Sequence, residues 1–273
     1  MSYTNSGKRE DGARVASLEH RLLTERNLRV LGGLAVLGLA VLAVLGLSVA
    51  PPDRYQGDAQ RLMYVHVPTA MMGFTAFAVT TAASGLYLWR RTRNAHWDRL
   101  AVSSAELGVV FTTLTLGLGM LWGKPIWGEY WTWDARLVTT AVLLFLYLGY
   151  LALRRMIADP GTRARRSALA AIVAFADVPV VYFSVDWWRS LHQKGTLVNG
   201  GRFDPQIHGT MLLALLWGFG AMGVAYVYLL ARRYLLVEME EGIEERMLDV
   251  AIAERLAEAE LDQAASVVET EVV

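Results

Sequence analysis

The chain has 273 residues, of which 54% are apolar and 19% are charged, and its mean hydropathy is positive. Long uncharged runs in such a composition exclude an ordinary soluble domain and favour a polytopic membrane protein. There is no cysteine, which excludes disulfides, thiolate metal ligands and thiol catalysis. The 26 basic and 26 acidic residues cancel, so no nucleic-acid partner is expected.

Six apolar runs approach the length of about 20 residues that crosses the hydrocarbon core of a bilayer. The sequence therefore predicts an all-α polytopic membrane protein with six transmembrane helices. The runs, in chain order, are Val30–Ala50, Val67–Trp89, Leu100–Trp122, Leu137–Leu153, Ala168–Val185 and His208–Leu230.

Basic residues predict the orientation of these spans. Of the 26 lysines and arginines, 19 fall in the N-terminal segment, in the second and fourth links between spans, or in the C-terminal segment. The positive-inside rule makes these segments cytoplasmic. Both termini are then inside, and the residue 122–136 loop and the link Asp186–Ile207 are outside.

Three parts follow from this reading: a cytoplasmic N-terminal extension (1–29), a six-helix membrane domain (30–233) and an acidic cytoplasmic tail (234–273). Apolar residues recur in the tail at steps of three and four among acidic ones, which predicts a helix, either solvated or docked on a partner. The chain has no glycine-rich phosphate loop, so we expect no ATP hydrolysis by the protein itself.

An aromatic cluster occupies the outer loop WGKPIWGEYWTWDAR, which runs from Trp122 to Arg136. Tryptophan is common at bilayer edges, where its ring is half apolar and half polar. This loop holds more aromatic side chains than an anchor needs, and they suit a large, flat, apolar ligand. The side chains are Trp122, Trp127, Tyr130, Trp131 and Trp133.

Two histidines are expected on the same outer side, His66 in YVHVP and His192 in WWRSLHQKG. Imidazoles from two segments can approach a metal from opposite faces, and histidine is a common axial ligand of haem iron. Cations that could meet haem propionates are Lys124, Arg136, Arg61, Arg189 and Lys194. The simpler alternative for His66 and His192 is that both are hydrogen-bonded loop residues. A third histidine on this side, His208, begins the sixth span and is either a ligand or an interfacial anchor.

Two acidic residues, Asp134 and Asp177, have structural explanations as well. Asp134 is placed to cap the N-terminus of the fourth span. Asp177 lies inside the fifth span, two residues before Pro179, and a protonated carboxyl there could donate to a freed carbonyl. Together with Glu106 in the third span, it is the only support for the alternative of a secondary transporter.

These motifs resemble those of a known family. WGKPIWGEYWTWDAR resembles the tryptophan-rich WWD signature of haem-handling membrane proteins, and RLMYVHVPTA, VYFSVDWW and SLHQ follow in the same order. Within that superfamily the chain resembles cytochrome c maturation protein C, also called haem exporter protein C. The resemblance covers roughly Tyr55 to Leu230. Tyr130 departs from the pattern, since some relatives carry another tryptophan there, and Glu129 adds a charge.

The resemblance implies a function. Such proteins bind b-type haem non-covalently at the outer face of the bacterial inner membrane and deliver it to a periplasmic haem chaperone for c-type cytochrome biogenesis. They work with an ABC-type ATPase and its membrane subunits. By motif match, His66 and His192 are the axial iron ligands, and Asp134 joins the four tryptophans as a signature position. The enzymatic alternative is a cytochrome c synthase of the same superfamily, but such chains are longer and have more spans.

Overall fold

The computed structural model describes residues 24–199 and 202–271. The expected N-terminal extension therefore lies mostly outside the described residues. Six helical segments are long and apolar enough to cross a membrane, so the prediction of an all-α, six-span, multi-pass membrane protein is confirmed. The chain separates into two compact units, 1–232 and 233–273.

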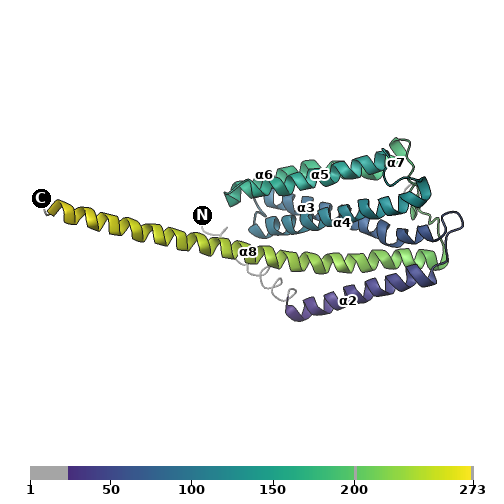
Figure 1. The fold of residues 1–273 in the computed structure, drawn as a ribbon, viewed down its shortest axis with the longest axis horizontal. Helices are drawn as coiled ribbons and strands as arrows, with labels where there is room; N and C mark the ends of the chain where they lie inside the picture. The colour runs from purple at the N-terminus through teal and green to yellow at the C-terminus, as the bar shows by residue number, and fades with distance from the viewer. Residues whose placement is uncertain (1–23, 200–201, 272–273) are drawn as a thin grey trace. The chain divides into compact units, whose positions relative to one another are not determined.

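Each predicted span corresponds to helical structure (Figure 1). The first is α2 (Glu25–Val44), which continues into the π-helical η1 (Leu45–Val49). The others are α3 (Met63–Leu88), preceded by the 3₁₀ turn η2 (Asp58–Leu62), then α4 (Ala95–Trp127), α5 (Ala135–Arg155), α6 (Pro160–Phe175) with α7 (Asp177–Trp187), and α8 (Gly209–Glu271). A two-residue hairpin, β1 (Val198–Asn199) and β2 (Arg202–Phe203), precedes α8.

Side-chain caps explain where four of these helices begin. Thr24, Asn94, Asp134 and Asp159 each accept a hydrogen bond from a backbone N–H of the first turn of α2, α4, α5 and α6. Such caps satisfy donors that the helix itself cannot satisfy. The prediction that Asp134 caps the fourth span is confirmed.

The fifth span is interrupted at Ala176, between α6 and α7. The interruption lies three residues before Pro179, which has no backbone N–H to donate. Asp177 follows directly, and its Oδ2 is buried without a hydrogen-bond partner. The expected donation from Asp177 to a freed carbonyl is therefore not made through this oxygen.

Helices α3 to α7 pack on one another through an aromatic and alanine-rich core. Phe77 of α3 stacks on Tyr147 of α5, with ring centroids 3.6 Å apart. Gly108 of α4 makes this contact possible, because a Cβ there would lie 2.4 Å from the Phe77 ring. A second cluster joins α2, α3 and α8 around Leu42, Tyr64 and Leu215.

Consecutive spans run in alternating directions, so the start of α3, the end of α4, the start of α5 and the end of α7 meet at one end of the bundle (Figure 1). The residues expected to bind the ligand all lie at these helix ends, in the loop between α4 and α5, or in the loop after α7.

Candidate functional site

His66 lies in the first turn of α3, beside the end of α4. Its ring meets the edge of the Trp122 ring, with centroids 5.6 Å apart. Gly119 of α4 leaves room for it, because a Cβ at Gly119 would lie 3.0 Å from the imidazole Cε1. The carbonyl of Thr115 lies close to the ring, but the buried Nδ1 makes no hydrogen bond of accepted geometry.

Trp122 is itself fixed from outside the tryptophan-rich loop. Its indole Nε1–H donates to Oε1 of Gln56 at 3.0 Å, across the link that precedes η2. The ring also packs against the cluster of Leu42, Tyr64 and Leu215. Trp122 therefore forms a rigid wall beside His66.

His192 lies in the loop after α7, and its ring meets Trp127 edge-on at 4.8 Å between centroids. Its Nδ1 is 3.0 Å from Oδ2 of Asp134. The Asp134 side chain is only 2% exposed, and that of His192 is 18% exposed. The N-cap of α5 thus also orients the histidine of a loop almost sixty residues away.

The Asp134 carboxylate accepts hydrogen bonds from four donors. Oδ1 accepts from the backbone N–H of Leu191 at 2.7 Å. Oδ2 accepts from the backbone N–H of Arg136 at 3.0 Å, from Oγ of Ser190 at 3.1 Å and from His192. These bonds fasten the loop that carries His192 to the N-terminus of α5.

The charges of this pair are set by burial and by these hydrogen bonds. Burial alone would raise the pKa of Asp134, but the donors from Leu191, Ser190, His192 and Arg136 lower it below its usual value. Burial lowers the pKa of His192, and the attraction of Asp134 only partly opposes this. At neutral pH the pair is a carboxylate and a neutral imidazole. Nδ1–H must then donate to Asp134, which leaves the Nε2 lone pair available to a metal.

The two histidines are close enough for their charges to interact, and Arg136 interacts with both. They come from different elements, His66 from α3 and His192 from the loop after α7. Within residues 24–199 and 202–271, no three His, Asp or Glu side chains gather to hold a metal ion.

The aromatic side chains of the tryptophan-rich loop fall into two groups. Trp122 and Trp127 contact the histidines. Trp131 instead meets Trp133 edge-on, with centroids 6.0 Å apart, and Trp133 is 86% exposed. Tyr130 is exposed beneath the ammonium group of Lys124, which lies 5.2 Å from the ring centroid. Trp133 also lines a hollow of about 550 Å³ with Trp188 and Arg189.

The expected propionate partners have different environments. Arg61 donates to the carbonyls of Gly46 and Ala50 at 2.7 and 2.8 Å and bonds Asp58, so it ties η2 to the end of η1. Lys194 pairs with Asp186 at 3.2 Å. Arg136 donates from Nη2 to the carbonyl of Tyr182, but its buried Nε has no partner. It therefore retains a donor beside the two histidines.

Sequence reasoning missed Gln56, Ser190 and Gly119, which help to position the expected site residues. Only Ser190 lies within a motif that was singled out, SLHQ. Gln56 acts from the link before η2, and Gly119 acts through the absence of a side chain. No local pattern marks such roles.

The fold and this site define a multi-pass membrane protein with a paired-histidine, tryptophan-walled site at one end of its helix bundle. The family described as heme exporter protein C matches residues 14–252, and the chain belongs to this family.

The chain is 36% identical over 235 residues to heme exporter protein C of Bradyrhizobium diazoefficiens, covering 84% of this chain and 86% of that one. It is 37% identical to heme exporter protein C of Escherichia coli K12, over 76% of this chain and 84% of the relative. It is also 37% identical to a putative cytochrome c biosynthesis ccmC-like mitochondrial protein of Arabidopsis thaliana, over 66% of each chain.

Proposed function

We propose that this protein handles haem during the maturation of c-type cytochromes, as the names of its relatives suggest. His66 and His192 would be the axial ligands of the iron. The single observation that carries this proposal is that two imidazoles from separate elements each stand against a tryptophan and lie within electrostatic reach of each other.

The donor set fits a b-type haem. Neutral imidazole is the form that binds iron, and Asp134 holds His192 with Nδ1 turned inward and Nε2 free. The rings of Trp122 and Trp127, which lie beside the two histidines, suit contact with an apolar macrocycle, and Arg136 would supply a donor for a propionate. The chain has no cysteine, so binding through a thioether to the protein is excluded.

Orientation then determines the role. The excess of basic residues supports an outward-facing histidine end, which in a bacterium would be the periplasmic side of the inner membrane. A haem presented there is accessible to a periplasmic haem chaperone, which we propose as the recipient. The chain has no phosphate-binding loop, so an ABC-type ATPase and its membrane subunits would supply the energy for releasing the loaded chaperone.

The test is the absorption spectrum of the detergent-purified protein and of single-histidine variants. His66→Ala and His192→Ala should each reduce the haem content and shift the Soret and alpha bands, while His208→Ala should retain the wild-type spectrum. Wild-type spectra in both His66→Ala and His192→Ala would refute the ligand assignment. Loss in His208→Ala alone would transfer the role to that residue.

A further inference from the structure

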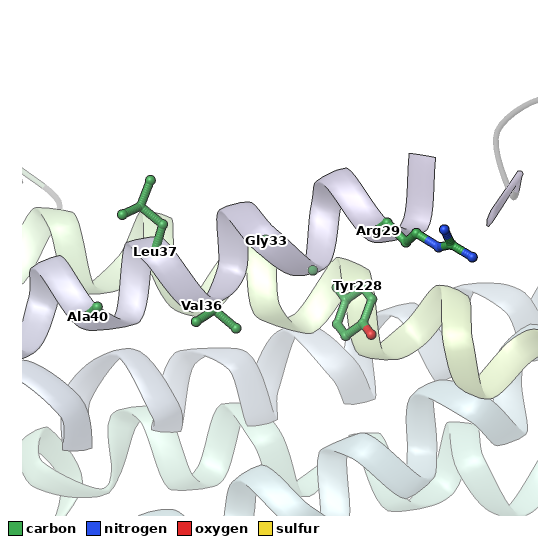
Figure 2. A pocket seen from close by; sticks show the side chains of 7 residues that line it. Arg29, Gly33, Val36, Leu37, Ala40 and Tyr228 are labelled. Atoms are coloured by element: carbon green, nitrogen blue, oxygen red, sulfur yellow. The ribbon is translucent and has the colours of Figure 1, made fainter. Parts of the chain in front are cut away.

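A shallow groove runs along one face of α2, far from the histidine end. It has a volume of about 590 Å³. Six lining residues recur on α2 at steps of three and four, which is the spacing of one helix face. The lining residues are Arg29, Gly32, Gly33, Val36, Leu37, Ala40 and, from α8, Tyr228. Figure 2 shows Arg29 and Tyr228 towards one end of the groove and Ala40 at the other.

Two glycines shape this groove. A Cβ at Gly32 would lie 3.0 Å from the ring of Tyr228, whereas a Cβ at Gly33 would meet nothing within 4 Å. Val36 and Leu37 are 70% and 60% exposed. Only 17% of the most apolar window of this span is buried, less than in the other five candidate spans of the described chain. In a membrane the groove is therefore open to lipid.

The length of the groove matches one leaflet. Eleven residues separate Arg29 from Ala40, which at 1.5 Å per residue is ~16 Å, about half of the ~30 Å hydrocarbon core. An acyl chain lying along Val36, Leu37 and Ala40 would have its headgroup at the level of Arg29.

Positive charge surrounds that end. Glu25 is shared between two arginines, with Oε2 4.0 Å from Nε of Arg29 and Oε1 3.6 Å from Nη1 of Arg232. Arg26 lies one helical turn before Arg29 and adds a third guanidinium. One carboxylate cannot neutralise three arginines. The Tyr228 hydroxyl has no hydrogen-bond partner among the described residues, and it is a further donor to an anion.

We propose that the α2 groove binds an anionic glycerophospholipid, with one acyl chain along its apolar length and the phosphate at Arg29 and Arg232. A phosphate next to apolar chains complements the groove in both charge and shape, and basic pockets between transmembrane helices are typical binding sites for anionic headgroups. The site is independent of haem binding. If the basic end is cytoplasmic, as the charge bias predicts, the lipid belongs to the inner leaflet.

The first experiment titrates the full-length protein in detergent with phosphatidylglycerol or phosphatidylcholine and counts bound lipid by native mass spectrometry. We expect tighter binding of phosphatidylglycerol. Arg29→Gln and Arg232→Gln should each weaken it about fivefold and leave phosphatidylcholine unchanged. The matched control is Arg165→Gln with Arg166→Gln on α6, which should alter neither. Equal affinities for the two lipids, or equal effects of both arginine pairs, would overturn the proposal.

A second pair of variants tests the apolar part of the groove. Gly33→Leu fills the groove where an added side chain meets nothing, and it should remove the tight phosphatidylglycerol site. Gly149→Leu on α5, where a Cβ also meets nothing within 4 Å, should retain it. Retention in Gly33→Leu would overturn the proposal. A photo-crosslinker can also be placed at Leu37 and activated in native membranes. Crosslinking to another polypeptide would overturn the proposal, because the groove would then be covered by a partner subunit.

Discussion

Replacing Asp134 by asparagine separates its role as a helix cap from its role in orienting His192. Asparagine has the same shape and is itself a good N-cap, so α5 should still form. It has only one acceptor oxygen, however, whereas Asp134 uses Oδ1 for Leu191 and Oδ2 for Arg136, Ser190 and His192.

The magnitude follows from this geometry. If the asparagine oxygen keeps the three donors on the Oδ2 side, its amide nitrogen faces the N–H of Leu191, and a buried donor is left unsatisfied. That costs about 1–3 kcal/mol, which lowers the equilibrium constant for docking of the His192 loop by about 5- to 150-fold. The haem content should fall, by at most this factor. Loss of the carboxylate also removes basicity from His192, so the midpoint potential of the remaining haem should rise.

The assay compares Soret absorbance per mole of protein, redox titration and thermal unfolding for Asp134→Asn, Asp134→Ala and Asp159→Asn. Asp159 caps α6 in the same way, by accepting from the N–H of Thr162, but it contacts no histidine, so its variant should keep wild-type haem content. If Asp134→Asn retained both the haem content and the midpoint potential while Asp134→Ala lost stability, Asp134 would be only a cap.

Two further predictions test the walls of the site. Gly119→Val should displace the ring of His66 and lower the haem content at unchanged membrane levels of the protein. Gly117→Val, at a position where a Cβ meets nothing within 4 Å, should leave the haem content unchanged. Equal spectra for the two variants would contradict the close approach of His66 to Gly119. Trp127→Ala should lose more haem than Trp133→Ala, at a cost of ~1 kcal/mol or more per aromatic contact, because Trp127 contacts His192 whereas Trp133 contacts Trp131. Equal haem content in the two tryptophan variants would show that the two aromatic groups are equivalent.

Apolar length was sufficient to predict the six spans, because a helix in lipid must satisfy its own backbone. Periodicity and caps also predicted the N-cap at Asp134. The extents were less accurate: all six helical segments extend beyond their apolar runs at one end or at both, since the polar ends of a transmembrane helix carry no hydropathy signal.

The site was less predictable than the fold. Motifs identified His66 and His192 but not the bond between His192 and Asp134, because that bond depends on how the loop after α7 folds back onto α5. Charge alone suggested Arg61 as a propionate partner, whereas the structure uses it to hold main-chain carbonyls. Long-range contacts of this kind have no periodic signature in the sequence.

Orientation is the prediction on which delivery to a periplasmic partner depends. Of the 26 basic residues, 19 are expected on one side, which is a strong bias under the positive-inside rule. Single cysteines can report on it without interference, because the chain has none. Gly128→Cys, at the end of α4, and Gly195→Cys, in the loop after α7, should react with a membrane-impermeant maleimide in intact spheroplasts.

Thr92→Cys and Thr162→Cys, at the opposite ends of the helices, are the matched controls and should react only after lysis. All four positions are at helix ends or in loops, so a difference in labelling reports the side of the membrane rather than burial within a helix. Protection of Gly128→Cys and Gly195→Cys together with labelling of Thr92→Cys would mean an inverted topology. The paired histidines would then face the cytoplasm, and a periplasmic chaperone could not receive haem from them.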